Sequence, residues 1–323
     1  MLQQADHSRR RRVSGQQRGR GRARGSLSFR RRSGRALIPS APVIRAAIRL
    51  LKIIPVPVAR LLAATLGTVS WSLQKGRRTT LLQNLSYTAP DRSPSERRRL
   101  ARRTFRNFAL TAVDLFRLPS LSTTELRSLF EIRGLEHVHA TQALGRGTII
   151  VTAHLGPYEL ASGCFAALGY PVHGLMEDLD PAVLEALASY RSATGMQLVN
   201  IKSGLRAVYR ILEQNHFLAV VGDRAIGDAR GAIEVPFAAG VRPMPVGPAV
   251  FAQATGAPII TAFSYRNPGS GPRYVMEFEP PVFAEGRDEA ERRRLIGHIV
   301  ERMEAAIRRN PDQWFVFQPN WIE

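Results

Sequence analysis

Hydrophobic and polar residues alternate between two kinds of segment along most of the chain. Short apolar or β-branched runs, typical of buried parallel strands, are separated by segments in which apolar residues recur at helical spacing. The expected strands cover about 130–133, 148–153, 171–176, 197–201, 217–222, 258–265 and 273–278. The expected helices cover about 93–118, 134–143, 157–168, 181–194, 203–215, 245–255 and 287–309. This alternation predicts an α/β fold with a mostly parallel central sheet flanked by helices.

Two apolar segments precede this region and predict N-terminal amphipathic helices. Residues 43–54 have basic side chains at near-helical spacing, and Pro55 and Pro57 then interrupt the pattern. Residues 61–73 are mostly apolar and uncharged, and a helix of this length measures about 20 Å, less than the ~30 Å hydrocarbon core of a bilayer. We expect this helix to lie in a membrane interface or to pack on the domain, with an ordinary buried helix as the alternative.

Charge is distributed unevenly along the 323 residues, whose formal net charge is +20. Residues 1–36 hold twelve arginines and one acidic residue, which predicts a disordered basic arm. The surface of an anionic membrane is its favoured partner, ahead of a misassigned start codon and then of nucleic acid. Nucleic acid ranks last because Phe29 is the only aromatic residue in the arm. The predicted domains are therefore this arm, membrane-interface helices over 37–75 and a catalytic domain over 76–323.

Several reaction classes lack their characteristic residues. The chain has no G-x-S-x-G, Walker A, H-E-x-x-H or C-x-x-C motif. Its histidines His173, His216 and His298 have no neighbouring ligands at metal spacing, so we expect no metal site. Cys164 is the only cysteine, which excludes an internal disulfide, fits a cytoplasmic chain and predicts a small buried hydrophobic side chain.

His154 follows the apolar run 148–153, and Gly156-Pro157 then starts a helix with Glu159 in its first turn. His154 thus lies at the carboxyl end of a strand, where open α/β sheets bind their ligands. His154 and Glu159 can meet across a strand-to-helix corner, although they would diverge on one helix. A carboxylate bonded to one ring nitrogen raises the basicity of the other and makes a general base for an alcohol. A core histidine beside a solvated glutamate is the alternative.

A second predicted strand, 217–222, also ends in polar residues. Asp223 and Arg224 follow it directly and should face the same edge of the sheet as His154. A simple Asp–Arg ion pair that caps a turn is the alternative, weaker for Asp223 than for Arg224. Arg230 and Arg242 lie near glycines that suggest a mobile loop and hairpin over the site, where they would bind acidic headgroups or remain solvated.

The motif His154-x4-Glu159 resembles the H-x4-D/E motif of glycerolipid and glycolipid acyltransferases. Other matching motifs follow in order: Asn84-Leu85, Ser93-Pro-Ser-Glu96, Arg191 with Gly195, Asp223-Arg224, Val235-Pro-Phe237, Gly256-Ala-Pro-Ile259, Asp312-Gln-Trp314 and Gln318-Pro-Asn-Trp321. From about Arg77 to Trp321 the chain resembles the lipid A biosynthesis acyltransferase family, which includes phosphatidylinositol-mannoside acyltransferases. Pro157, Tyr158 and Arg224 depart from the lipid A branch and, with the C-terminal motif, favour the mannoside branch.

The resemblance implies a membrane-associated acyltransferase at the cytoplasmic face of a bacterial inner membrane. His154 would act as general base supported by Glu159, while Arg191, Asp223 and Arg224 would bind substrate. Asp223 would lie at the active site and orient His154, Arg191 or the sugar. The acyl group would pass directly from acyl-CoA or acyl-carrier protein to a hydroxyl of a glycolipid, without a further cofactor. We expect an apolar tunnel beginning close to His154 and oxyanion donors among the backbone N–H groups around Gly156.

Two other functions remain open from the sequence. Within the same class, the acceptor would be a lysophospholipid or glycerol phosphate. From another class, the chain would be a non-enzymatic protein that binds a membrane surface or nucleic acid through its arm. The aromatic residues Trp314, Phe315, Phe317 and Trp321 are expected to pack in the core or a lid, with a lipid-facing edge as the alternative.

Overall fold

The computed structural model describes residues 46, 49–51, 53–176, 193–201, 204–224 and 231–322. The chain divides into two compact units, Met1–Ile38 and Pro39–Glu323. The first unit, including the predicted basic arm, lies outside the described residues. So do half of the predicted 43–54 helix and nearly all of the predicted 181–194 helix.

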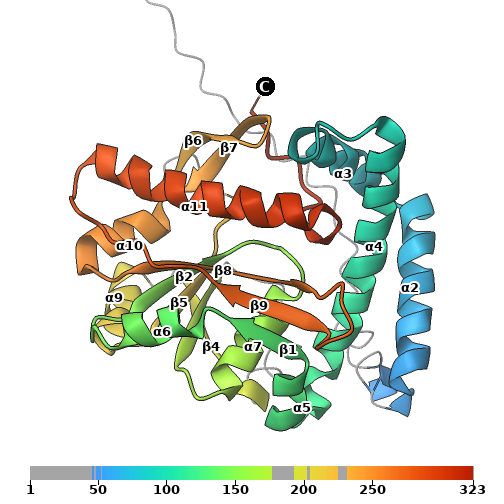
Figure 1. Cartoon of the computed structure of the whole chain (residues 1–323), viewed down its shortest axis with the longest axis horizontal. Coiled ribbons are helices and arrows are strands. Elements are labelled where there is room, and N and C mark those ends of the chain that lie inside the picture. Colours follow the sequence, from blue (N-terminus) through green and yellow to red (C-terminus); the bar gives the residue numbers. More distant parts are fainter. Residues whose placement is uncertain are drawn as a thin grey trace, which may run out of the picture. The chain divides into compact units, whose positions relative to one another are not determined.

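A seven-stranded sheet forms the centre of the second unit, in the order β1-β9-β8-β2-β5-β3-β4 (Figure 1). The strands are β1 Phe130–Arg133, β2 Thr148–Thr152, β3 Val172–Met176, β4 Gln197–Asn200, β5 Phe217–Val221, β8 Ile259–Arg266 and β9 Tyr274–Phe278. Neighbouring strands are parallel except β8 and β9. The connection between these two is too short for a crossover, so they pair antiparallel. The predicted mostly parallel sheet is confirmed.

Helices cover both faces of the sheet, and each face has its own hydrophobic core. These helices are α5 Thr123–Ser128, α6 Leu135–Gln142, α7 Tyr158–Ala167, α9 Leu205–Glu213, α10 Gly247–Thr255 and α11 Glu289–Arg309. Strand β2 alternates between the two cores: Ile149 and Val151 join residues of α9, α10 and α11, whereas Ile150 joins residues of α5, α6 and α7. All five residues of β2 are buried, as its apolar run predicted.

The helix α2 Val56–Leu73 is five residues longer than the predicted 61–73 helix. Pro57 stands in its first turn, where the N–H that proline lacks would have no helical partner, so this helix accommodates it. The predicted break after the 43–54 segment falls at Ile54 and Pro55, which are not helical. The helix α3 Lys75–Thr88 follows, and then α4 Pro94–Arg117. The predicted capping box at the start of α4 is present between Ser93 and Glu96.

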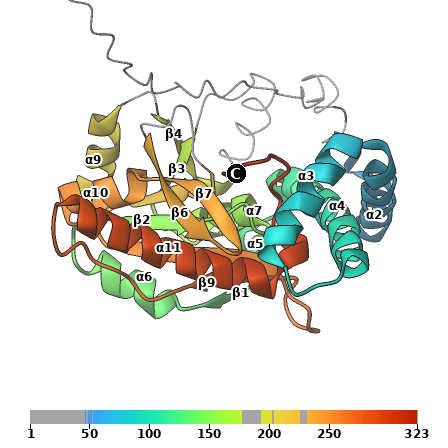
Figure 2. The same cartoon turned by 90° about the horizontal axis from the view of Figure 1, so that it is seen from above.

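α2 lies alongside α4 (Figures 1 and 2). Its buried face consists of the small residues Ala59, Ala63 and Gly67, which allow close approach of the two helices. Arg60 also forms a 2.6 Å ion pair with the buried Asp114 of α4. The prediction that this apolar segment packs on the domain is therefore confirmed in the described residues.

The C-terminal segment runs from α11 back over α3 and to the end of β2. A 3₁₀ turn, Pro311–Gln313, opens it, and Trp314 then forms a bridge with Leu155. The buried Asn84 of α3 fixes the segment through both atoms of its amide: Nδ2 donates to the Val316 carbonyl at 2.8 Å, and Oδ1 accepts from the Trp321 indole at 2.8 Å. The hairpin β6 Ala232–Phe237 and β7 Gly240–Pro245 packs beside it.

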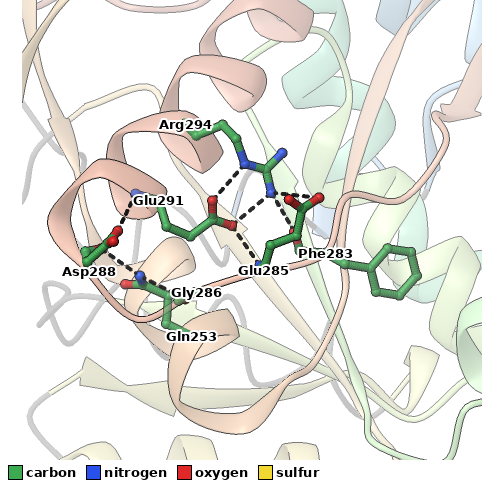
Figure 3. Close-up of polar contacts among 7 residues, drawn as sticks. All are labelled: Gln253, Phe283, Glu285, Gly286, Asp288, Glu291 and Arg294. Atoms are coloured by element: carbon green, nitrogen blue, oxygen red, sulfur yellow. Dashed lines mark hydrogen bonds and ion pairs between the residues drawn. The ribbon is translucent and has the colours of Figure 1, made fainter.

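The start of α11 is fixed by a polar network that joins it to α10 (Figure 3). Asp288 caps the helix by accepting from the Glu291 N–H, while Gln253 donates to the Asp288 carbonyl at 2.9 Å. Hydrogen bonds from Arg294 and from the Glu285 N–H lower the pKa of Glu291 to about 2. This network joins the start of α11 to α10.

Candidate active site

The register between β2 and β5 brings His154 and Asp223 together. The parallel pairs run from Thr148–Phe217 to Thr152–Val221, a constant separation along the chain. The Gly222 N–H extends the pairing by donating to the Thr152 carbonyl at 2.8 Å. Each site residue follows its strand by two positions, so both arrive at the same place on the carboxyl edge of the sheet. The prediction that they share this edge is confirmed.

Asp223 binds His154 through both carboxylate oxygens. The Oδ1 atom lies 2.6 Å from His154 Nδ1, and Oδ2 accepts from the His154 backbone N–H at 3.0 Å. The indole of Trp314 donates to the same Oδ2 at 2.8 Å. Burial by itself would raise the pKa of the fully buried Asp223. The charge of His154 and these hydrogen bonds outweigh burial, so the pKa lies below its usual range and the carboxylate is ionised.

The hydrogen-bond donor in this pair follows from the ionisation of Asp223. An ionised carboxylate only accepts hydrogen bonds, so the proton must lie on His154 Nδ1. The neutral ring then has its lone pair on Nε2, which makes that nitrogen the basic atom. The His154 side chain is 20% exposed, whereas Asp223 is fully buried.

Glu159 is not the partner of His154 Nδ1. The carboxylate on this nitrogen is that of Asp223, which the β2–β5 register brings to the ring. Glu159 lies in the first turn of α7 as predicted. Burial raises its pKa, an effect that His154 and a 3.4 Å hydrogen bond from the Tyr158 hydroxyl partly offset. The pKa values of the two carboxylates, Glu159 and Asp223, are thus shifted in opposite directions. Electrostatic support of His154 by Glu159 remains a prediction.

Gly156 makes the sharp turn after His154. Its φ is +56°, and a Cβ atom here would lie 2.3 Å from the Ser264 carbonyl oxygen, so only glycine fits. The Gly156 N–H donates to the Gln313 carbonyl at 2.8 Å. The C-terminal segment thus occupies the Gly156 N–H itself, and the expectation of oxyanion donors among the neighbouring backbone N–H groups stays a prediction. Pro157 occupies the N-cap of α7, one residue earlier than predicted.

Arg242 is a site residue whose place the sequence did not reveal. The hairpin buries it completely, against the expectation of a loop arginine that binds headgroups or stays solvated. Its Nη2 donates to the Asp223 carbonyl at 3.1 Å. Its guanidinium lies 4.9 Å from the ring centres of Trp314 and Trp321 and 5.3 Å from that of Phe237. Burial lowers the pKa of Arg242 to about 10, although the charge of Asp223 acts in the opposite direction.

Trp314 is the second such residue. The expectation of core packing is confirmed by its 1% exposure, but its indole also orients Asp223. A buried indole N–H needs an acceptor, which is the only signal that the sequence offered. That signal does not say which acceptor it finds.

Of the two arginines predicted to bind substrate, Arg224 is among the described residues and Arg191 is not. Arg224 is half-buried and donates to the Gln318 side chain at 2.6 Å, which links the end of β5 to the C-terminal motif. Its role toward substrate remains a prediction. Arg191 and Arg230 lie outside the described residues.

A small apolar cavity of about 30 Å³ lies between α7 and the sheet. Its lining includes Ile150, Ala161, Phe165, Ala219, Met276 and Tyr158. The Tyr158 ring also contacts the His154 ring edge-on, with centres 5.2 Å apart. The Tyr158 ring therefore lies between His154 and the cavity.

Neither a metal cluster nor a reactive thiol accompanies these residues. Among the described residues, no three His, Cys, Asp or Glu side chains group together as metal ligands would. Cys164 is buried on α7, as predicted, and burial raises the pKa of its thiol to about 11. A neutral, buried thiol is a poor nucleophile.

Comparison with known proteins finds similar sequences over most of the chain. The sequence profile of the bacterial lipid A biosynthesis acyltransferases matches residues 33–323. A phosphatidylinositol mannoside acyltransferase of Mycobacterium tuberculosis is 24% identical over 216 residues, 65% of this chain and 66% of its own, just under two thirds of its length. The Mycolicibacterium smegmatis protein of that name is 24% identical over 229 residues, covering 69% and 72% of the two chains. A lipid A biosynthesis lauroyltransferase of Escherichia coli is 23% identical over 239 residues, covering 74% and 77%.

Proposed function

Since the chain belongs to the bacterial lipid A biosynthesis acyltransferase family, we propose that it transfers a fatty acyl group from a thioester to a hydroxyl of a membrane glycolipid. The observation that carries the proposal is the Asp223–His154 pair at the carboxyl edge of the sheet. We favour an acceptor of the phosphatidylinositol-mannoside kind, because relatives with that name include the M. tuberculosis and M. smegmatis proteins. A lysophospholipid or glycerol phosphate is the second acceptor class to test.

The reaction is a direct transfer. His154 Nε2 takes the proton of the acceptor hydroxyl as its oxygen attacks the thioester carbonyl carbon. Asp223 stabilises the imidazolium that forms, and Glu159 adds a nearby carboxylate charge once it is ionised. When the tetrahedral intermediate collapses, the C–S bond breaks and the departing thiolate takes the proton back from His154. A thioester is already activated, so these steps need no metal or further cofactor, and either coenzyme A or acyl-carrier protein can serve as the donor.

The acyl chain enters the cavity behind Tyr158 in this proposal. A volume of about 30 Å³ corresponds to roughly two water-sized probes, too little for a fatty chain. The Tyr158 side chain contacts the His154 ring and also lines the cavity, so its rotation would join the two spaces. Arg191 and Arg224 bind the phosphate of the acceptor or donor in the same proposal.

Attachment to the cytoplasmic face of a bacterial membrane is part of the proposal. Among the described residues, α2 is the one helix whose length and composition would allow it to cross a bilayer, and most of its surface is exposed. Its exposed apolar residues are Val58, Leu61, Leu62, Leu66, Val69 and Leu73. The double variant Leu62→Asp with Leu66→Asp should shift the chain from the membrane to the soluble fraction. The matched pair Thr79→Asp with Ser128→Asp, on exposed polar sites, should not.

The test of the function is the His154→Ala variant. Purified protein is given acyl-CoA or acyl-carrier protein as donor, and phosphatidylinositol mannosides or a lysophospholipid as acceptor. Loss of the general base should lower turnover by on the order of 10²- to 10⁴-fold, whereas His298→Ala on α11 should leave it near normal. Transfer that survives His154→Ala at a near-normal rate would overturn the mechanism. Absence of transfer with every donor and acceptor would favour a non-enzymatic membrane or nucleic-acid binder.

A further inference from the structure

A hollow whose lining does not include His154 lies between the C-terminal end of α2, the helix α3 and the N-terminal end of α4. Its volume is about 740 Å³, within the range of small-molecule sites. Its apolar lining includes Trp71 and Leu82, and its hydroxyls come from Ser86 and Ser95. The remaining side chains are four arginines, Arg97, Arg98, Arg99 and Arg102, and no acidic residue lines the hollow. We call it the arginine pocket.

The four arginines form no ion pair with any acid of the described chain. The adjacent Glu96 is committed to the capping box with Ser93 and lies 3.6 Å from Arg92, outside the pocket. By contrast, Arg103 on the other side of α4 pairs with Asp312 at 2.8 Å. Of the four arginines, Arg99 interacts with Glu96 through charge alone. The lining itself holds no acidic residue, so the pocket concentrates positive charge.

The position of these arginines on α4 works against helix stability. Arg97, Arg98 and Arg99 follow within two turns of the helix start at Pro94. The positive end of the helix dipole lies there, so cations at this end are unfavourable and anions are favourable. An anion in the pocket would meet both the arginines and this end of the helix. Guanidinium groups bind phosphate oxygens through paired hydrogen bonds. The four arginines therefore suit a phosphate group better than a small spherical anion.

The pocket is connected to the active site through α3. Ser86 and Leu82 line the pocket, whereas Tyr87 of the same helix stacks on Trp321 with ring centres 4.1 Å apart. Asn84, between them, holds the C-terminal segment that carries Trp314 to Asp223. A ligand in the pocket thus lies against the helix that fixes this segment.

We propose that the arginine pocket binds a phosphate ester that belongs to one of the two substrates. This inference rests on the proposed function, because an acylated phospholipid and a coenzyme A thioester both carry such a group. The headgroup phosphate of the acceptor and the nucleotide phosphates of the donor are the two sources. Either phosphate would be anchored away from the reacting hydroxyl and thioester. Its contacts with the arginines would contribute to substrate binding but not to proton transfer.

Binding without turnover tests the pocket. The full-length chain is titrated calorimetrically with glycerophosphoinositol and, separately, with coenzyme A. The variant Arg97→Gln/Arg98→Gln/Arg102→Gln is compared with Arg287→Gln/Arg293→Gln/Arg308→Gln, three exposed arginines on or beside α11. All three proteins keep the basic arm, so the unspecific attraction of the anionic ligands to that arm is the same in each. Loss of one charge-assisted hydrogen bond typically weakens binding about tenfold or more.

The expected result is that the pocket variant binds one of the two ligands at least tenfold more weakly, while the α11 variant binds as the parent does. Weaker binding of glycerophosphoinositol identifies the acceptor headgroup, and weaker binding of coenzyme A identifies the donor. Unchanged affinity for both ligands would overturn the proposal. So would a defect confined to transfer from acyl-carrier protein, which would make the patch a protein-docking surface.

Two further measurements keep this result separate from the proposed function and from misfolding. His154→Ala should bind both ligands normally, so a failure of the catalytic mechanism would leave the pocket result standing. Thermal unfolding is recorded for each variant. If the triple pocket variant is unstable, the single change Arg98→Gln at an exposed position provides the same comparison, with about a tenfold effect expected.

Discussion

The indole of Trp314 donates a 2.8 Å hydrogen bond to Oδ2 of Asp223, 91 residues earlier in the chain. Three hydrogen bonds therefore converge on this carboxylate, two from His154 and one from Trp314. Beneath them, Arg242 donates to the Asp223 carbonyl and lies over the Trp314 ring. The acid that orients His154 is itself oriented by the hairpin and the C-terminal segment.

Trp314→Phe should weaken this support. It removes a hydrogen bond to a buried charge, which costs about 1.5–3 kcal/mol of unfolding free energy at neutral pH. The pKa of Asp223 is lower in the folded chain than in the unfolded chain, where it is about 3.9. The ionised carboxylate therefore stabilises the fold above about pH 3.9, and this stabilisation is lost as pH falls through the pKa of the folded chain. The difference between parent and variant, measured by urea unfolding, should therefore shrink as pH falls below about 4.

Trp321→Phe is the matched control, because its indole donates to the neutral Asn84 amide. A neutral hydrogen bond contributes about 0.5–1.5 kcal/mol, and its loss should not depend on pH in this range. A difference between parent and Trp314→Phe that stays constant with pH would show that the indole does not stabilise the ionised form of Asp223.

Asp223→Asn should abolish most of the activity with little change in shape. The asparagine amide can donate to Nδ1, which would move the ring proton to Nε2 and leave no basic nitrogen for the acceptor hydroxyl. The corresponding change in serine proteases lowers turnover about 10⁴-fold, and we expect a fall of on the order of 10²- to 10⁴-fold. Turnover is measured at saturating donor and acceptor.

Asp288→Asn makes the same chemical change at the N-cap of α11, where asparagine caps as well as aspartate does. This control should retain both activity and stability. An Asp223→Asn variant with more than a tenth of the parent turnover would contradict the role of Asp223 in setting the tautomer of His154.

The sequence predicted the strand ends better than the partners of the side chains found there. Apolar runs of four to six residues identified β2 and β5, and polar residues directly after them identified His154 and Asp223. Which carboxylate binds Nδ1 depends on the register between strands separated by 69 residues, and a single sequence does not contain that register. The local spacing from His154 to Glu159 therefore suggested the nearer acid.

Arg242 shows a second limit of sequence reasoning. Charged residues between glycines are normally solvated, and although the glycines suggested a hairpin over the site, nothing in the local pattern indicates that it buries Arg242. Three aromatic rings, one from β6 and two from the C-terminal segment, are needed to bury its guanidinium. Such burial by parts of the chain far apart in sequence is visible only in the folded structure.

The buried His173 on β3 predicts a loss of stability in mild acid. Its Nε2 lies 3.0 Å from His216 Nδ1, and burial followed by the charge of His216 lowers its pKa below 6.5. Between the pKa of His173 in the unfolded chain and its lower pKa in the folded chain, the unfolded chain binds more protons. The free energy of unfolding therefore falls as pH falls below about 6.5. The slope from this residue is at most about 1.4 kcal/mol per pH unit.

Urea unfolding of the parent and of His173→Gln, measured from pH 7.5 to pH 5, checks this prediction. Glutamine keeps hydrogen-bonding groups but does not titrate, so the slope with pH should be smaller in the variant even if its absolute stability is lower. Titrating groups that do not contact His173 contribute equally to both proteins, and the measured change in slope belongs to the His173–His216 pair. Equal slopes would show that His173 does not titrate differently in the folded and unfolded chains.

Gly67 controls how closely α2 packs on α4. A Cβ atom at this position would lie 2.7 Å from the Phe105 carbonyl oxygen and 2.8 Å from the Arg106 Cα, both backbone atoms that cannot move aside alone. Gly67→Ala should therefore destabilise the chain by about 1–3 kcal/mol, although alanine favours helix formation. Gly76→Ala on α3 has nothing within 4 Å of the new methyl group and should stabilise it by up to about 1 kcal/mol. Unfolding of the two variants in detergent should thus shift in opposite directions. A stabilising Gly67→Ala would mean that α2 does not lie this close to α4, and that its apolar surface reaches the membrane in another arrangement.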